Sequence, residues 1–344
     1  MRIRLCSLLP SLAALAAAAL AAGSARAADQ ALIDAARKEG SVTWYTTAIV
    51  DQFVRPAVAA FEAKYGVKVD YARASTAELE LRVINEARAG KMLADLVDGT
   101  TVPIVLRQQN LIEKWIPATT LPARYIDPEG YWLACNEYVL ATGYNTDLVP
   151  KGTEPKTWED LLDPKYKGKM AWNTKPSSSA GQGFVGNILM DMGEEKGRAY
   201  LAKLGQQDIS GMSVTARQVL DTVIAGEFSI ALQIFNNHAV ISARKGAPVG
   251  WLKLEPALAV VLPMAVTKNS PHPNAGKLLF DFIMSDEGQT IMAKAGELPV
   301  APNIPPLDPN LRPETGHFRA QYIEPARLQS SLAHWTDVYN DYFR

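Results

Sequence analysis

Small polar side chains that stand between an apparent strand and an apparent helix have the clearest chemical potential in this sequence. A helix start offers unpaired backbone N–H groups and the positive end of the helix dipole. Several such starts in one place would bind an anion without a basic patch. The same residue types are the ordinary caps of helices, so capping alone explains any single position. The candidates are Thr46, Thr47, Ser75, Thr76, Thr100, Thr101, Ser177, Ser178, Ser179, Thr215, Asn236 and Asn237.

Two stretches hold more polar residues than one cap requires. In "TKPSSSAGQGF" three consecutive serines, 177–179, stand between a proline and a Gly-x-Gly helix start. In "FNNHAVISARKGAP" an apolar run ends at Asn236, Asn237 and His238, where a helix is predicted to begin. These three side chains are candidate ligand contacts. His238 would donate a hydrogen bond or make affinity depend on pH, and a satisfied structural role is the alternative.

Two arginines stand at the predicted site. Arg73 comes just before the Ser75 cap, and Arg217 lies in "TARQ" at another helix start. Each would pair with an anion, although a solvated surface or a structural ion pair is the commoner role of such a side chain. Hydroxyls, amides and helix ends suit a small organic anion such as a carboxylate, a phosphonate or a phosphorylated compound. The four histidines show no close-spaced metal pattern, so we predict no metal site and no cofactor.

Strands and helices alternate along the first part of the chain. Strands are predicted at 41–46, 67–72 and 94–99, and helices at 50–66, 77–90 and 100–110. Ser75 and Glu78 form an S-x-x-E capping box before the second helix. This alternation predicts a parallel sheet with helices on its faces.

After about residue 125 the pattern changes. The β-rich stretch 131–149 has no helical period and is predicted to cross from one lobe to another, and 257–269 is predicted to return. Between these crossings we predict helices at 180–204 and 215–226 and strands at 228–234 and 249–254. Residues 272–296 are predicted to be helical, and the proline-rich stretch 298–313 to be an extended surface wrap.

The first 27 residues differ in composition from the rest. Arg2 and Arg4 precede an apolar stretch that ends in Ala25-Arg26-Ala27, which predicts a cleaved signal peptide and a mature chain from Ala28; a membrane anchor is the weaker alternative. The protein is therefore expected in the periplasm, with one remaining cysteine and no disulfide. The mature chain keeps 32 of the 35 basic residues against 36 acidic ones, a net charge of −4 that argues against nucleic-acid binding.

The sequence resembles the type 2 periplasmic substrate-binding proteins of ABC importers, in the ferric iron or family 1 extracellular solute-binding branch. The likeness lies in "SVTWYTT", "TWEDLLDPKYKGKMAWN", "VIAGEFSIAL" and "HPNAGKLLFDFIMSDEGQTIMAKAG". It implies a monomeric two-lobed α/β receptor, each lobe a mixed, mainly parallel sheet flanked by helices, which closes on a solute and delivers it to a permease. The implied division is residues 28–132 plus 267–344 for lobe 1 and 133–266 for lobe 2, with hinge strands near 133–146 and 255–266.

Two other functions remain open. Ferric-binding members of the branch carry adjacent tyrosines about where His238 and Ala239 stand here, so a ferric receptor is the alternative rather than the first expectation. An exported α/β hydrolase is the remote alternative. The chain lacks G-x-S-x-G, and its histidines follow no recognisable order. We therefore do not expect an enzyme.

Overall fold

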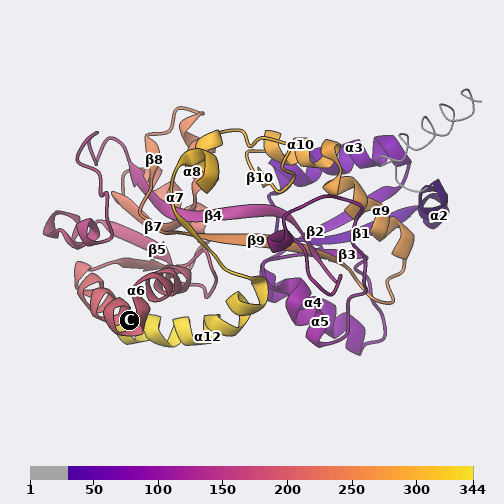
Figure 1. The fold of residues 1–344 in the computed structure, drawn as a ribbon, viewed down its shortest axis with the longest axis horizontal. Helices are drawn as coiled ribbons and strands as arrows, with labels where there is room; N and C mark the ends of the chain where they lie inside the picture. Colours follow the sequence, from indigo (N-terminus) through magenta and orange to yellow (C-terminus); the bar gives the residue numbers. More distant parts are fainter. Residues whose placement is uncertain (1–29, 344) are drawn as a thin grey trace, which may run out of the picture.

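A mixed β-sheet runs through the computed structural model, which describes residues 30–343. The main path of hydrogen-bonded strands is β2-β1-β3-β9-β4-β7-β5-β6. Figure 1 shows that the helices gather into two lobes at opposite ends of this path. The predicted signal peptide lies outside the described residues. Among residues 30–343, none of the helices combines the length and apolar character of a membrane span.

The first lobe, on the right in Figure 1, is built on parallel strands. β1 pairs with both β2 and β3, and apolar side chains on the two faces of these strands pack against helices. The strands are β1 (Ser41–Thr46), β2 (Lys68–Arg73) and β3 (Leu96–Asp98); the helices are α2 (Gln30–Glu39), α3 (Arg55–Tyr65), α4 (Thr76–Arg88), α5 (Val102–Gln108), α9 (Pro273–Met284) and α10 (Asp286–Lys294).

The second lobe, on the left, repeats this arrangement. β5 lies between β6 and β7, parallel to both. The strands are β5 (Met170–Asn173), β6 (Ser210–Met212), β7 (Ile230–Phe235) and β8 (Val249–Leu252); the helices are α6 (Gly181–Leu204), α7 (Ala216–Ile224), α8 (Asn236–Ala243) and α12 (Pro325–Tyr342).

Two long strands connect the lobes. β4 (Leu133–Asn145) and β9 (Ala257–Val266) are antiparallel neighbours that cover the two predicted crossings. Almost every side chain along them is buried. Each long strand also pairs with one short strand: β10 (Leu298–Pro299) pairs with β4, and β11 (Ala320–Tyr322) pairs with β9. The core is shared as well, since one buried cluster contains Trp44 and Phe53 of the first lobe and Trp172 and Phe184 of the second.

Three segments differ in detail from the predicted elements. The predicted helix 50–66 begins with a π-helical turn, Val50–Val54, before α3. The predicted helix 272–296 divides at Ser285, whose backbone is extended and whose hydroxyl accepts from the Gly288 N–H to begin α10. The predicted wrap 298–313 includes β10 and a 3₁₀ turn, Pro309–Leu311, before α11 (Pro313–Gly316).

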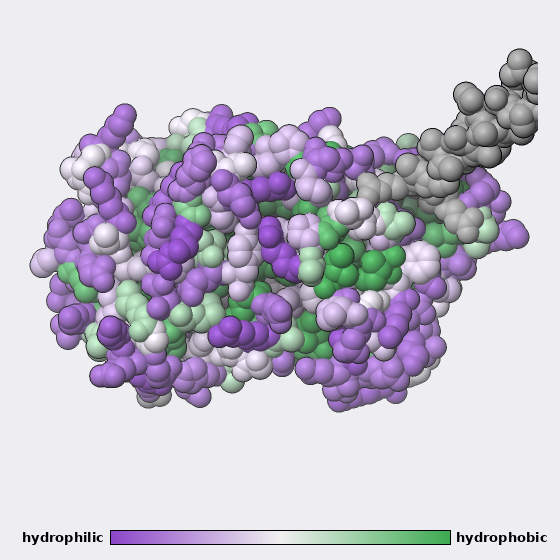
Figure 2. Space-filling model, in the orientation of Figure 1, coloured by the Kyte–Doolittle hydropathy of each residue, from purple (hydrophilic) through white to green (hydrophobic). Residues whose placement is uncertain are grey.

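The C-terminal helix, which falls in the segment assigned to lobe 1, packs mainly on α6 of the second lobe and also contacts α5 of the first. α12 packs along α6, where the Trp335 ring covers Gly186 and the Tyr339 ring covers Gly181. Trp172 of β5 also contacts Tyr339, with ring centroids 5.3 Å apart. We therefore propose that α12 belongs to the second lobe, while the other predicted boundaries stay a prediction. Figure 2 shows a mainly hydrophilic face, with apolar residues grouped over the first lobe.

Candidate functional site

The loops after β1 and β3 are held together by a buried carboxylate, Asp98. Its oxygens accept from Trp44 Nε1 at 2.8 Å, from the Thr47 N–H at 2.8 Å and from Thr47 Oγ1 at 2.9 Å. Burial raises the pKa of Asp98, and the hydrogen bonds from the threonines and Trp44 oppose that rise. Thr46 is fully buried and its Oγ1 accepts from the Ala48 N–H. Asp98 therefore positions Thr46 and Thr47 at the carboxyl edge of the first-lobe sheet.

Three of the predicted site residues act as helix caps. Ser75 forms the predicted capping box, with its hydroxyl and its backbone N–H donating to Glu78 Oε2 at 2.7 and 2.9 Å. Thr215 makes the same arrangement with Gln218 at the start of α7. Thr101 begins α5, and its hydroxyl donates to Glu80 Oε1 at 2.8 Å. Thr76 and Thr100 lie partly exposed beside these caps.

The serine triplet folds tightly over the start of α6. The Ser178 carbonyl accepts from Gln233 Nε2 at 3.1 Å. A Cβ at Gly183 would lie 1.8 Å from that oxygen, so only glycine fits there. Ser178 is buried, whereas Ser177 and Ser179 are partly exposed with their hydroxyl oxygens 3.4 Å apart. The outer two serines are therefore the ones open to a solute.

The two asparagines at the start of α8 lie in the interior of the protein. Asn236 is fully buried, and its Nδ2 donates to the Leu311 carbonyl at 2.9 Å while its Oδ1 has no partner. Asn237 is also buried, beside Glu297, and its Nδ2 has no partner that meets hydrogen-bond geometry. These contacts join α8 to segments far along the chain. They do not place the asparagines at an open surface.

His238 is the residue of this trio that approaches the other lobe. Burial lowers its pKa to about 4, helped by the positive charges of Arg217 and then Arg73. Its Nδ1 is buried without a partner. Arg73 comes from β2 of the first lobe and His238 from α8 of the second, so the fold brings residues of both lobes together.

The two predicted arginines differ in how they are held. Arg217 donates to Ser242 Oγ at 2.8 Å and pairs with Asp221 at 2.7 Å, so its charge is largely committed. The Arg73 side chain is exposed, and its guanidinium forms no hydrogen bond or ion pair with any residue in 30–343. A free guanidinium beside a neutral imidazole is suited to an anion.

Two residues near α8, Asn136 and Glu297, were not predicted. Glu297 is buried, accepts from Asn136 Nδ2 at 3.2 Å, and has one oxygen without a partner. Burial raises its pKa to about 7. The ring of Tyr138 in β4 lies 4.7 Å from that of Phe235, which in turn lies 5.2 Å from the His238 ring. Asn136 and Glu297 lie 161 positions apart, which is why no local pattern indicated them.

Neither a metal cluster nor either of two surface depressions coincides with the predicted site residues among residues 30–343. Within residues 30–343, no three His, Cys, Asp or Glu side chains are grouped to hold a metal ion. Two adjoining surface depressions, about 390 and 590 Å³, lie on the second lobe around Glu159 and Asp191. Neither is lined by a predicted site residue.

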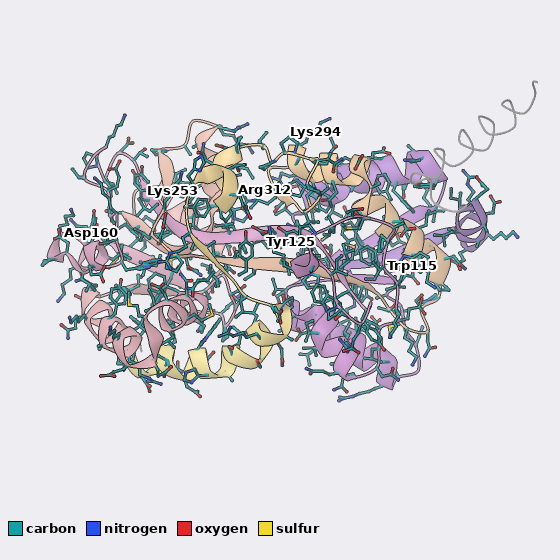
Figure 3. All side chains as sticks on the ribbon, viewed as in Figure 1. Trp115, Tyr125, Asp160, Lys253, Lys294 and Arg312 are labelled. Carbon is teal, nitrogen blue, oxygen red and sulfur yellow. The ribbon has the colours of Figure 1, made fainter. Side chains whose placement is uncertain are left out.

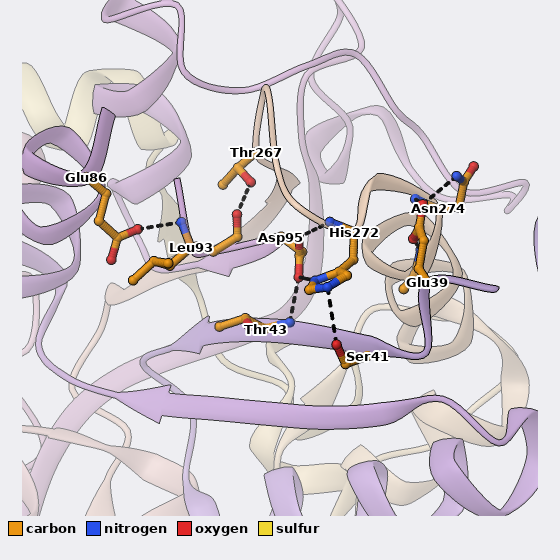
Figure 4. Close-up of polar contacts among 11 residues, drawn as sticks. Glu39, Ser41, Thr43, Glu86, Leu93, Asp95, Thr267, His272 and Asn274 are labelled. Atoms are coloured by element: carbon orange, nitrogen blue, oxygen red, sulfur yellow. Dashed lines mark hydrogen bonds and ion pairs between the residues drawn. The ribbon is translucent and has the colours of Figure 1, made fainter. Parts of the chain in front are cut away.

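A series of hydrogen bonds links Ser41, His272 and Asp95 in the order found in the catalytic triad of serine hydrolases (Figure 4). Ser41 Oγ lies 3.2 Å from His272 Nε2, and His272 Nδ1 lies 3.0 Å from Asp95 Oδ2. The sequence showed no recognisable Ser-His-Asp arrangement, but the structure contains one. It lies at the start of β1, at the opposite end of the strand from the carboxyl edge of this sheet. These hydrogen bonds join β1, β3 and α9.

A hydrolase also needs free N–H groups to bind an oxyanion. The nearby donors at the start of α9 already have a partner. Glu39 accepts from the Asn274 N–H at 3.2 Å and from the Ala275 N–H at 2.7 Å. The arrangement is suited to holding α9 against the sheet.

The sequence of this chain is similar to those of known bacterial solute-binding proteins. Residues 99–318 match the family model of the bacterial extracellular solute-binding proteins. The chain is 28% identical over 204 residues to a putative 2-aminoethylphosphonate-binding periplasmic protein of Salmonella typhimurium, a match that spans 57% of each chain. It is 22% identical over 308 residues to Iron uptake protein A1 of Synechocystis, covering 82% of each.

Solved structures show the same fold. Iron-bound HitA from Pseudomonas aeruginosa superimposes with a TM-score of 0.73 at 22% identity, covering 87% of this chain and 99% of that one. AfuA from Actinobacillus pleuropneumoniae, with fructose-6-phosphate bound, superimposes with a TM-score of 0.74 at 20% identity, covering 88% and 98%. With its two lobes, its crossing strands and a family match over most of its length, this chain belongs to the bacterial extracellular solute-binding protein family.

Proposed function

We propose that this protein is a periplasmic receptor that captures a small anionic solute by closing its lobes and delivers it to an ABC permease. It acts as a monomer and catalyses no reaction. One observation carries the proposal: the unpaired guanidinium of Arg73 lies close enough to His238, on the other lobe, to lower its pKa. A solute held between these residues contacts both lobes, so it stabilises the closed form.

The chemistry of the site favours a phosphonate or a phosphorylated compound. Arg73 supplies a planar, permanently charged donor, and Ser177 and Ser179 supply hydroxyls. His238 is neutral at the pH of the periplasm because its pKa is about 4. It therefore gives or accepts one hydrogen bond without adding a charge. One relative described above is named as a putative 2-aminoethylphosphonate-binding protein, and the AfuA structure has fructose-6-phosphate bound; both compounds carry such an anionic group.

Ferric iron is the second candidate solute. It is favoured by the likeness to Iron uptake protein A1 and to iron-bound HitA. Thermal melting with 2-aminoethylphosphonate, fructose 6-phosphate, a carboxylate series and ferric iron separates the two candidates. We expect a phosphonate or phosphate ester to raise the melting temperature without being consumed. Stabilisation by ferric iron alone, with a phenolate charge-transfer colour, would contradict the anion proposal.

Replacing Arg73 tests the role of the unpaired cation. Because a charged hydrogen bond contributes about 1.5–3 kcal/mol, Arg73→Ala is expected to weaken binding of the stabilising solute about ten- to a hundredfold. The melting temperature without solute stays near that of the native protein, since Arg73 has no partner to lose. Arg88→Ala, which removes another exposed and unpaired arginine from the same lobe, is the matched control and should bind normally. Equal affinities of the two variants would remove Arg73 from the site.

A further inference from the structure

A network of charged and aromatic side chains joins the two lobes across the outer face of β4. Arg124 lies in the 3₁₀ turn Ala123–Tyr125, which precedes β4. Its Nη2 donates to Tyr125 Oη at 2.9 Å and pairs with Glu314 Oε1 at 3.2 Å. The guanidinium lies between two rings, 4.6 Å from the centroid of Tyr125 and 4.8 Å from that of Tyr322. Such stacking favours a cation.

Glu137 of β4 is the buried centre of this network. Tyr125 Oη donates to its Oε2 at 2.5 Å. Tyr322 Oη lies 3.5 Å from Glu137 Oε1 and 3.2 Å from Glu314 Oε1, one of which takes its proton. Burial raises the pKa of Glu137, while the bond from Tyr125 and the charge of Arg124 lower it. Every member of the network thus has a partner.

The two sides of the network are anchored on different lobes. On the Glu314 side, the Gly316 carbonyl accepts from Lys253 Nζ at 2.6 Å, and Phe318 packs on Trp251 of β8 with ring centroids 5.4 Å apart. On the Arg124 side, Asp127, three positions further along the chain, pairs with Arg107 of α5 at 3.3 Å. Figure 1 shows the chain before α12 passing in front of β4 and β9, and Figure 3 labels Tyr125 near the centre of the molecule.

The network and the candidate site lie on opposite faces of β4. Successive side chains of a strand point to opposite faces. Tyr138 packs on Phe235 toward His238, so its neighbour Glu137 points away from the site. If the lobes rotate about β4 and β9 to close on the side of His238, the opposite side opens. Closure therefore separates Arg124 from Glu314 and Tyr322.

We infer that Arg124, Tyr125, Glu137, Glu314 and Tyr322 form a latch that holds the lobes apart at the solute side and opposes closure. The inference rests on the proposed function, because it concerns the closure that captures the solute. The latch sets how much of the protein is closed before solute arrives. Since the apparent dissociation constant varies inversely with the binding-competent fraction, a weaker latch gives a tighter receptor.

Interlobe distances in solute-free protein test this inference. Spin labels at Leu81→Cys and Leu148→Cys, two exposed positions on different lobes, report the separation by pulsed electron resonance. Cys135 is fully buried and stays unlabelled. Arg124→Ala removes one exposed ion pair and the stacking of the guanidinium on two rings. It should therefore raise the ratio of closed to open protein about three- to tenfold. Glu314→Gln and Tyr322→Phe keep the side-chain size and should shift the ratio the same way by less.

Arg198→Ala is the matched control. Arg198 also forms two surface ion pairs, with Glu194 and Asp341, but both partners lie within the second lobe. Its distance distribution should equal that of the native protein. The inference is overturned if Arg124→Ala, Glu314→Gln and Tyr322→Phe all match Arg198→Ala or move the lobes apart. The distance measurement uses no solute. Its result therefore tests the latch separately from the melting screen, which tests the proposed function.

Discussion

At the scale of single residues, two ionisable groups near α8, the partly exposed His238 and the buried Glu297, respond to pH in opposite directions. The pKa of His238 falls from its ordinary 6.5 to about 4 in the folded protein, so the unfolded chain binds more protons between these values. Folding stability from this group is lost as pH falls through that window. The pKa of Glu297 rises from 4.5 to about 7, so the folded protein binds more protons and stability is lost as pH rises. Between pH 4.5 and 6.5, the contributions of His238 and Glu297 to the change of folding stability with pH have opposite signs and partly cancel.

Single substitutions should separate these contributions. Compared with the native protein, His238→Gln should gain stability as pH falls from 7 to 4.5, because its unfolded chain no longer takes up that proton. Glu297→Gln should gain stability as pH rises from 4.5 to 7.5. Each relative change is expected to be about 1–3 kcal/mol. Urea unfolding at several pH values measures both, and a constant offset from the native curve across this range would contradict the cited pKa shifts.

At the scale of elements, the seam between α6 and α12 depends on glycine. Helix propensity alone favours alanine over glycine by about 1 kcal/mol inside a helix. At Gly186, however, a Cβ would lie 2.2 Å from the Trp335 ring. Packing should therefore outweigh propensity, and the sign of the effect shows which one prevails.

Gly186→Ala is expected to destabilise the protein by about 1–3 kcal/mol, the usual range for overpacking. Chemical unfolding measures the loss. In a Trp335→Leu background, where the ring is absent, the same substitution should be neutral or stabilising. A stabilising effect of Gly186→Ala in the native background would mean that α12 does not lie against α6 at this point.

Sequence patterns were most informative for the strands and helices of the first lobe and for the crossings, and least informative for the site; they did not indicate α12. β-rich runs located β1, β3 and the long crossings β4 and β9, and a capping box located α4; almost every side chain of the two crossings is buried. They could not separate a cap from a ligand contact, since Ser75 and Thr215 would show the same residue types in either role. Partners distant in sequence, such as Asp98 with Trp44, carry no local pattern at all.

At the scale of the whole molecule, the two lobes are not independent units. The chain passes between them in β4 and β9 and again between β10 and α12, and one buried cluster includes side chains from both lobes. Lobe closure must therefore be a bend of the crossing strands within one cooperative structure. This distinguishes the protein from two domains tied by a linker, which would unfold separately.

The protein should accordingly unfold in a single thermal transition. Calorimetry is expected to give a calorimetric enthalpy equal to the van't Hoff enthalpy, because neither half of the shared core survives loss of the other. Gly186→Ala, which weakens only the second lobe, should shift the whole transition to lower temperature. A native profile with two transitions, or a variant in which one half melts early while the other keeps its native midpoint, would show that the lobes fold independently and that the shared core couples them only weakly.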